Sequence, residues 1–291
     1  MKLEGVITAL VTPFTEAEDI DFDNFGKLIE DQIANGVKGF VPLGSTGEYY
    51  AMNSEEKASV LKFVKEVVGD RVLLIAGGNA GSTREVIGNV RVAAELGYDT
   101  VLLAPPYYSL PSQEELTAHY RKIIDTVPVD LVLYNYPPRV GVEVGFEVMD
   151  AFKDDPRVIA VKESSGSLAR AIDIKTRYGD SYQLSCGSDD VALDFLIWGA
   201  GSWICGPANC FPKQTVAMVD AHARGDIAGA QAVMRKLYAA MSSLETGKFV
   251  QKVKYGCELA GIPCGPSRMP LMPLTDAEKA GFRKAFEIAT A

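Results

Sequence analysis

The stretch VIAVKESSGS, residues Val158–Ser167, joins an apolar run to a lysine and then to a turn of small polar residues. Near-continuous apolar runs are typical of parallel strands that are buried on both faces of a sheet. A primary ammonium strongly prefers water, so Lys162 at the end of such a run either extends outward along its own methylenes or is held for chemistry. The fold around the stretch decides between the two.

Eight apolar runs of this kind recur along the chain at intervals of a few tens of residues, the size of one βα unit. They begin at Gly5, Gly39, Val72, Thr100, Val129, Val158, Tyr182 and Gly201. Helical spacing fills the intervals, for example in DFDNFGKLIEDQIANG (residues 21–36) and in the segment capped by Asn53. Eight such units predict an α/β fold of the closed (β/α)8 TIM-barrel type. An open doubly wound sheet would carry a G-x-G-x-x-G turn after its first strand, and no such turn follows the first run.

After about residue 212 the strands stop and the sequence predicts only helices. Their expected ranges are Pro212–Arg224, Ile227–Leu244, Lys248–Ala260 and Asp276–Ala289. The first of them completes the eighth unit. We therefore expect a barrel over residues 1–224 and a C-terminal helical extension, residues 225–291, packed on it.

Composition restricts the partners and the location of the chain. Its formal net charge of −9 is spread without a basic cluster, which argues against nucleic acid and anionic membranes and favours small molecules. Five cysteines without a C-x-x-C pair and only two histidines argue against a metal site, and we expect no cofactor. The N-terminal segment is too interrupted for a signal peptide, and no run reaches the ~20 apolar residues of a membrane span. A cytoplasmic location is expected.

Polar side chains gather after the strands, where a (β/α)8 barrel carries its functional groups. Ser45 and Thr46 lie between glycines in GSTGE, which suits either a carboxylate-binding turn or an ordinary capped turn. Tyr108 follows the fourth run, and Tyr134 and Arg139 follow the fifth, next to prolines that mark strand ends. Each tyrosine alone fits ordinary packing, and Arg139 alone fits a surface cation. Together they indicate a site for an acidic small molecule.

Strand alternation suggests a direction for the lysine. Val158, Ala160 and Lys162 are expected on one face of their strand, and Ile159 and Val161 on the other, against the helices. If the first set points inward, the amine is desolvated, which lowers its pKa and makes it a nucleophile toward carbonyls. The alternative is a lysine paired with a carboxylate in the barrel architecture. With hydroxyls, tyrosines and an arginine on neighbouring strand ends, we favour an imine-forming lysine and a bound oxo acid.

The ordered motifs GVITALVTPF, GSTGE, APPYYSLPSQEEL, LYNYPPRVG, VKESSGS, CGSDD and RMPLMPLT span nearly the whole chain. In this combination the sequence resembles the dihydrodipicolinate synthase and N-acetylneuraminate lyase superfamily of class I, Schiff-base enzymes. The resemblance implies that Lys162 forms an imine with pyruvate or a related 2-oxo acid. It also implies that Tyr134 shuttles protons, and that Ser45 and a Tyr108 from a neighbouring subunit complete a hydroxyl relay. A homotetramer built as a dimer of dimers is implied as well.

The resemblance further implies which residues bind the substrates. Ser45 and Thr46 would bind the substrate carboxylate, helped by the backbone at Ile204. Arg139 would hold the carboxylate of a second substrate.

Several residues depart from the synthase pattern. Ser45 stands where synthases usually carry threonine, which keeps the hydroxyl. Ser54 and Lys57 stand where lysine-inhibited synthases have histidines, so inhibition by lysine is not expected. In GSWICGPANCFP, Trp203 is expected to reshape the pocket wall at the last strand. These changes affect the expected substrate more than the imine chemistry.

The leading functional hypothesis is a lyase that condenses pyruvate with aspartate semialdehyde, because Arg139 in its Y-N-x-P-x-R context favours this over a sialic-acid lyase. The nearest alternative is a 1-pyrroline-4-hydroxy-2-carboxylate deaminase of hydroxyproline breakdown, toward which Trp203 and the tail VKYGCELAGIPCGPSRMPL point. Sugar-acid (2-keto-3-deoxy) aldolases and dehydratases come next. A non-catalytic barrel that only binds an oxo acid has no need of an imine-forming amine, so the combination of Lys162, Tyr134 and both hydroxyls argues against it.

Overall fold

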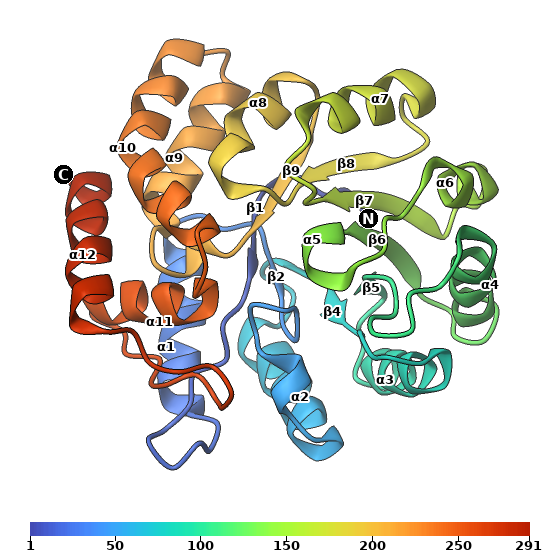
Figure 1. Ribbon diagram of the computed structural model, residues 1–291, viewed down its shortest axis with the longest axis horizontal. Coiled ribbons are helices and arrows are strands. Elements are labelled where there is room, and N and C mark those ends of the chain that lie inside the picture. The colour runs from blue at the N-terminus through green and yellow to red at the C-terminus, as the bar shows by residue number, and fades with distance from the viewer.

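The computed structural model describes residues 1–291. All strands belong to one parallel sheet, in the order β3-β2-β1-β9-β8-β7-β6-β5-β4. The strands are β1 (Gly5–Ala9), β2 (Gly39–Val41), β3 (Leu73–Leu74), β4 (Ala76–Gly77), β5 (Thr100–Leu103), β6 (Asp130–Asn135), β7 (Val158–Glu163), β8 (Gln183–Cys186) and β9 (Ser202–Cys205). The two edge strands, β3 and β4, are separated in the chain only by Ile75, so together they close the sheet into a barrel. Figure 1 shows this barrel with its helices outside, as predicted.

Each of the eight predicted apolar runs contributes to a strand of the barrel. The run that begins at Val72 differs in forming two short strands instead of one. The backbone N–H of Ile75, between them, donates to the carbonyl of Phe40 on β2, so the run keeps one neighbour across the interruption.

Helices alternate with the strands and form the outer layer of the barrel (Figure 1). They are α1 (Phe22–Ala34), α2 (Ser54–Val68), α3 (Thr83–Glu95), α4 (Gln113–Ile124), α5 (Pro137–Val140), α6 (Phe146–Phe152), α7 (Leu168–Tyr178), α8 (Ala192–Ile197) and α9 (Pro212–Ala223), with short 3-10 turns η1 (Tyr49–Ala51), η2 (Asp189–Val191) and η3 (Pro207–Asn209). The predicted cap at Asn53 is a complete capping box with Glu56. None of the helices is both long and apolar enough to cross a bilayer.

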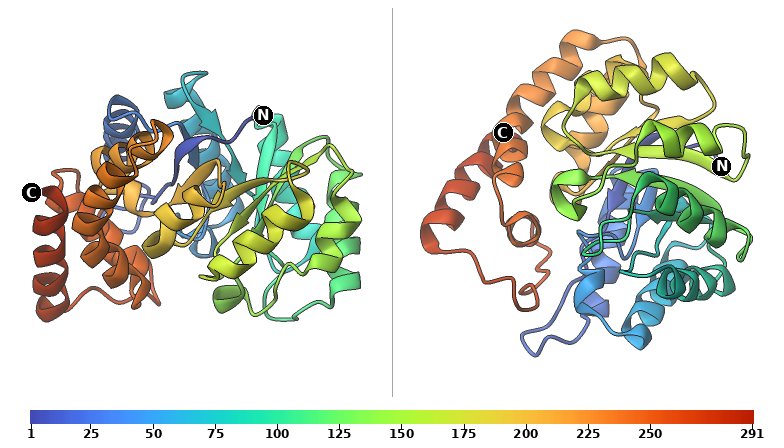
Figure 2. Two further views of the ribbon diagram at one scale, coloured as in Figure 1. Left: turned by 90° about the horizontal axis from the view of Figure 1, so that it is seen from above. Right: turned by 45° about the vertical axis from the view of Figure 1, so that its right-hand side comes forward.

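The C-terminal part is helical, as predicted, with α10 (Ile227–Glu245), α11 (Phe249–Leu259) and α12 (Asp276–Thr290). In both views of Figure 2 these helices lie at the side of the barrel that also carries the C-terminus. The helix α10 packs against both α9 and α12, so the last barrel helix and the C-terminal helices form a continuous layer. The division between residues 224 and 225 stays a prediction.

The apolar core has an inner and an outer part. A large cluster fills the space between strands and helices, and a smaller one, which includes Ile7, Ile75 and Ile204, fills the barrel interior. Such filling is usual for (β/α)8 barrels, whose interior is a packed core and not a pore.

The predicted facing of residues 158–162 is wrong at its first two positions. The register between β6 and β7 shifts where Leu131 pairs with Val158 and Val132 pairs with Ala160. As a result Val158 packs in the outer cluster and Ile159 packs against the inner one. The shift is complete before Ala160, so Ala160 lies in the interior cluster as expected.

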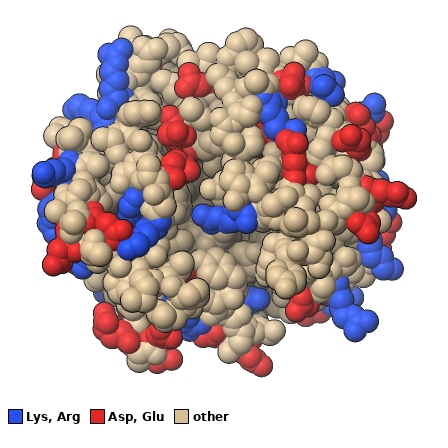
Figure 3. Space-filling view, viewed as in Figure 1, with Lys and Arg blue, Asp and Glu red and all other residues tan.

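Charges of both signs are interspersed over the face seen in Figure 3, which carries no continuous basic patch.

Candidate active site

The lysine and the first tyrosine lie side by side inside the mouth of the barrel. Tyr134 on β6 and Lys162 on β7 are direct partners in the strand register. The Nζ atom of Lys162 lies 4.4 Å from the centroid of the Tyr134 ring, and the lysine is only 6% exposed. No ion pair of the structure involves Lys162, so the alternative of a structural ion pair does not describe it.

A glycine makes room for the lysine side chain. Gly187 follows β8, and a Cβ atom placed on it would lie 2.8 Å from the Lys162 Cε atom and 1.8 Å from the Ser164 Oγ atom. Both separations are too short for any side chain, so the path of Lys162 to the barrel mouth depends on a glycine here. The motif CGSDD contains this residue, but its spacing alone does not reveal the contact.

The Nζ end of Lys162 faces a narrow inner chamber of about 30 Å³. Its lining comprises Ser45, Thr46, Tyr134, Tyr136, Arg139, Lys162, Gly187, Asp189, Ile204, Gly206, Glu245 and Phe249. The structure therefore brings six of the seven predicted site residues to one chamber, from the turn after β2 and from β6, α5, β7 and β9.

A larger outer chamber of about 500 Å³ shares Ser45, Tyr134 and Arg139 with the inner one. The tyrosine of the PPYY motif that lines it is Tyr107. Tyr108, the seventh predicted residue, is 95% exposed and lines neither chamber of its own chain.

The turn that carries the hydroxyls of Ser45 and Thr46 is held in place by contacts with two other parts of the chain. Thr12 donates from its Oγ1 to the Gly47 carbonyl at 2.8 Å, and Glu48 forms a buried ion pair of 2.6 Å with Lys254 of α11. The side chains of Ser45 and Thr46 take part in no hydrogen bond within the chain. A capping role would require such a bond, so the turn leaves both hydroxyls free for a ligand.

Two carboxyl groups without a predicted role, those of Asp189 and Glu245, also line the inner chamber. Asp189 begins η2 and is buried, and it accepts a hydrogen bond of 3.0 Å from the indole Nε1 of Trp203. Burial, reinforced by the nearby Glu245 carboxylate, raises the pKa of Asp189 well above its ordinary value. Glu245 is the last residue of α10. Asp189 is part of the CGSDD motif, whereas no sequence signal points to Glu245.

The expectation for Trp203 is wrong. Trp203 is fully buried in the outer cluster between strands and helices, and it lines neither chamber. Alternation explains this, because Ile204 points into the barrel and its neighbour must point away. Trp203 still contacts a residue of the chamber wall, through its hydrogen bond to Asp189.

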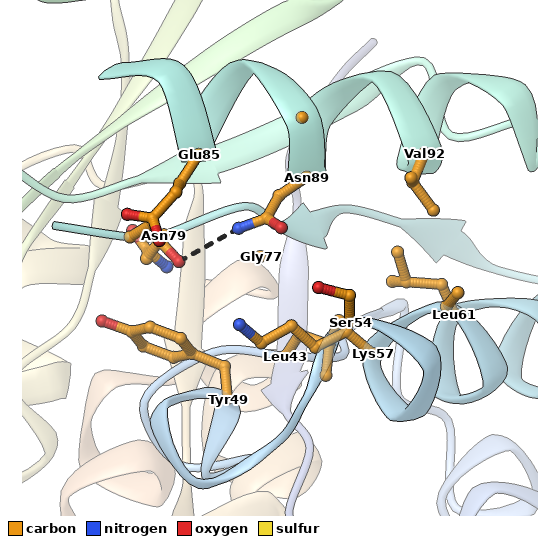
Figure 4. A pocket seen from close by; sticks show the side chains of 13 residues that line it. Leu43, Tyr49, Ser54, Lys57, Leu61, Gly77, Asn79, Glu85, Asn89 and Val92 are labelled. Atoms are coloured by element: carbon orange, nitrogen blue, oxygen red, sulfur yellow. Dashed lines mark hydrogen bonds between the residues drawn. The ribbon is translucent and has the colours of Figure 1, made fainter. Parts of the chain in front are cut away.

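A separate cavity of about 330 Å³ lies between α2 and α3, next to the outer chamber (Figure 4). Ser54 and Lys57 line it from α2, and Glu85 lines it from α3. Asn79 and Tyr49 line both this cavity and the outer chamber. The wall contains no histidine, in keeping with the departure at Ser54 and Lys57, and weak or absent inhibition by lysine stays a prediction.

Comparison with known proteins finds relatives that match nearly the whole chain. Residues 2–289 match the model of the dihydrodipicolinate synthetase family. A 4-hydroxy-tetrahydrodipicolinate synthase of Geobacter metallireducens is 36% identical, with 98% of this chain and 99% of the relative covered. One from an Exiguobacterium species is 33% identical, with 97% of each covered. The pyruvate complex of the Acinetobacter baumannii dihydrodipicolinate synthase superposes with a TM-score of 0.96 at 30% identity, covering 99% of both chains.

Proposed function

The chain belongs to the dihydrodipicolinate synthetase family, and on that basis we propose that it is a Schiff-base lyase that condenses pyruvate with aspartate semialdehyde. One observation carries the proposal: Lys162 is a buried amine without a carboxylate partner, stacked over the ring of Tyr134 in a chamber lined by free hydroxyls. Such an amine has a chemical use in imine formation.

In this proposal the Nζ atom of Lys162 attacks the C2 carbonyl of pyruvate, and the carbinolamine loses water to give an iminium. The positive nitrogen acidifies the methyl group at C3. Loss of a proton from C3 converts the iminium into an enamine. The enamine carbon then attacks the aldehyde of the second substrate and forms the new carbon–carbon bond. An amine or water finally displaces Lys162 from the imine carbon.

The neighbouring groups supply binding and proton transfer. The Ser45 and Thr46 hydroxyls and the Ile204 backbone bind the pyruvate carboxylate, and Arg139 binds the carboxylate of the second substrate. Tyr134, whose ring contacts the amine, carries protons to and from the reacting atoms with Ser45. In such a relay the phenol gives one proton while it accepts another from Ser45, so no charge is left on it, which suits a buried site.

The proposal includes a homotetramer built as a dimer of dimers, in which Tyr108 of one subunit completes the relay of its neighbour. The exposure of Tyr108 and of Leu110 in the same loop supports this, because apolar surfaces of this kind are commonly covered by a partner. We further propose a cytoplasmic enzyme whose ligands are small 2-oxo or imino acids, with no nucleic-acid or membrane partner.

A deaminase acting on 1-pyrroline-4-hydroxy-2-carboxylate is the second candidate. The observation that favours it is the buried Asp189 in the inner chamber, since burial raises the pKa of this carboxyl group well above its ordinary value. A carboxyl group that keeps its proton near neutral pH can protonate a departing hydroxyl or amine. No feature of the chambers favours a sugar-acid aldolase or dehydratase over these two.

The test is a direct comparison of the two reactions with the purified enzyme. Condensation is followed by the loss of pyruvate and aspartate semialdehyde together, and deamination by the release of ammonia from the pyrroline. We expect condensation with kcat/KM above about 10⁴ M⁻¹ s⁻¹, an ordinary enzymatic value. Ammonia release without condensation would replace the proposal by the second candidate. Lys162→Ala is the control and must be inactive in both assays.

A further inference from the structure

One basic and one acidic residue, Arg139 and Glu245, lie at the entrance to the inner chamber. Arg139 lies on α5 and Glu245 lies at the end of α10, so they reach the site from different parts of the chain. Both line the inner chamber with Lys162, and both line a neighbouring opening of about 390 Å³. A ligand that approaches Lys162 through this opening passes both groups.

Neither group has an ion-pair partner within the protein, and the Glu245 carboxyl group accepts a hydrogen bond from the backbone N–H of Asp189. No ion pair of the structure involves Arg139 or Glu245, either with each other or with a third group. The guanidinium of Arg139 lies 5.1 Å from the centroid of the Tyr136 ring, a contact that leaves its N–H groups available. The entrance thus offers one cation and one anion to a ligand.

The neighbouring acid differs in character from Glu245. Burial raises the pKa of Asp189 well above its ordinary value, which favours its neutral form, and its carboxyl group already accepts the Trp203 N–H. Burial and Asp190 also raise the pKa of Glu245 above its ordinary value, but the Asp189 backbone N–H, Arg139 and Lys162 limit the rise. Glu245 is therefore the better candidate for a negative charge at this wall.

We propose that Glu245 is a specificity-determining residue that binds the ammonium group of the second substrate while Arg139 binds its carboxylate. The site then selects an aldehyde that carries both groups on one carbon, as an α-amino acid does. The inference rests on the proposed condensation and names how its second substrate is chosen.

The selection follows from what an incomplete substrate leaves unpaired. Succinate semialdehyde has the carboxylate and the aldehyde of aspartate semialdehyde but lacks the ammonium group. When succinate semialdehyde binds, its carboxylate would pair with Arg139. The same molecule would displace water from Glu245 but would offer no ammonium group to Glu245 in return. Leaving a charged group without a partner is costly, so the enzyme should discriminate against this aldehyde.

The experiment compares wild type, Glu245→Gln and Glu245→Asp, with Glu258→Gln as the matched control. Glu258 is an exposed glutamate on α11 that lines none of these chambers. At saturating pyruvate, kcat/KM is measured for aspartate semialdehyde and succinate semialdehyde. If succinate semialdehyde does not react, its inhibition constant against aspartate semialdehyde is used. The KM for pyruvate and the borohydride-trapped pyruvate adduct are measured for every variant.

We expect Glu245→Gln to lower kcat/KM for aspartate semialdehyde by about 10- to 100-fold, mainly through KM. Its effect on succinate semialdehyde and on the pyruvate adduct should stay within about twofold. Glu245→Asp should restore part of the preference, and Glu258→Gln should match the wild type.

An equal loss with both aldehydes, or no loss, overturns this inference alone. A loss in kcat that is the same for both aldehydes assigns Glu245 to proton transfer instead. A wild-type enzyme that forms the pyruvate adduct and consumes neither aldehyde overturns both the proposed function and this inference.

Discussion

The Nζ atom of Lys162 lies 4.4 Å from the centroid of the Tyr134 ring, and the two residues are register partners on adjacent strands. Their relative position is therefore set by the backbone hydrogen bonds of β6 and β7 and not by a mobile loop. Sites built on strands hold their geometry more precisely than sites on loops.

The role of the Tyr134 hydroxyl can be separated by mutation from the role of its ring. In Tyr134→Phe the ring that contacts Lys162 remains, and only the hydroxyl is lost. Because general acid–base groups contribute about 10²- to 10⁴-fold, kcat should fall by about that factor. The melting temperature and the KM for pyruvate should change little. Steady-state kinetics with calorimetry checks this, and an unchanged kcat would remove Tyr134 from the relay.

The space at Gly187 should be essential for the lysine. In Gly187→Ala the new methyl group would collide with Ser164 and with the Lys162 side chain, so one of them must move. We expect a loss of about 1–3 kcal/mol in the free energy of unfolding and at least a tenfold slower formation of the pyruvate adduct. Gly281→Ala is the control, since a Cβ atom on this glycine of α12 meets nothing within 4 Å. The control should be as stable as the wild type or more so. A fully active Gly187→Ala variant would show that Lys162 does not follow the path described.

The buried ion pair between Glu48 and Lys254 should support the hydroxyl turn. Lys254→Met leaves the fully buried Glu48 carboxylate without its cation and should cost about 3–5 kcal/mol in unfolding free energy. Replacing both residues, by Glu48→Gln and Lys254→Met together, should recover most of that loss. Chemical denaturation of the four proteins of this double-mutant cycle measures the coupling. Strictly additive losses would contradict it.

The acid stability of the barrel should depend in part on Asp155. Burial acts against ionisation of Asp155, but hydrogen bonds from Arg157 and Arg121 outweigh it and lower the pKa of Asp155 to about 2. A carboxyl group whose pKa is lowered on folding stabilises the protein above its unfolded pKa, and this contribution is lost as the pH falls through the folded pKa. Asp155→Asn should therefore be less stable by about 1–2 kcal/mol at neutral pH, and the difference should shrink between pH values of about 4 and 2. Melting temperatures across this range provide the measurement, and a difference independent of pH would contradict the assignment.

The sequence predicts the parts of the fold that local patterns specify. The cap at Asn53 and the apolar runs depend on neighbours within a few residues, and the structure has them where expected. Local patterns do not predict that Val158 faces the outer cluster and Ile159 the inner one, because this facing depends on the pairing of β7 with β6. For Trp203, the sequence does carry a usable signal, because alternation with the inward-facing Ile204 predicts that the Trp203 side chain faces outward.

The candidate site also has residues that local sequence patterns predict and a residue that they do not. Motifs next to strand ends identified Ser45, Tyr134 and Lys162 because all strands of a parallel barrel end at the same mouth. Glu245 comes from a helix outside the βα repeat, so its place at that mouth follows only from how α10 packs on the barrel.

The central claim is that Lys162 is the amine that forms the imine. Its most direct test is borohydride reduction of the enzyme in the presence of pyruvate, followed by mass spectrometry of the intact protein and of its peptides. We predict one reduced pyruvate per chain, on the peptide that contains Lys162, and none in Lys162→Ala. No adduct, or an adduct on another lysine such as the buried Lys254, would contradict the claim.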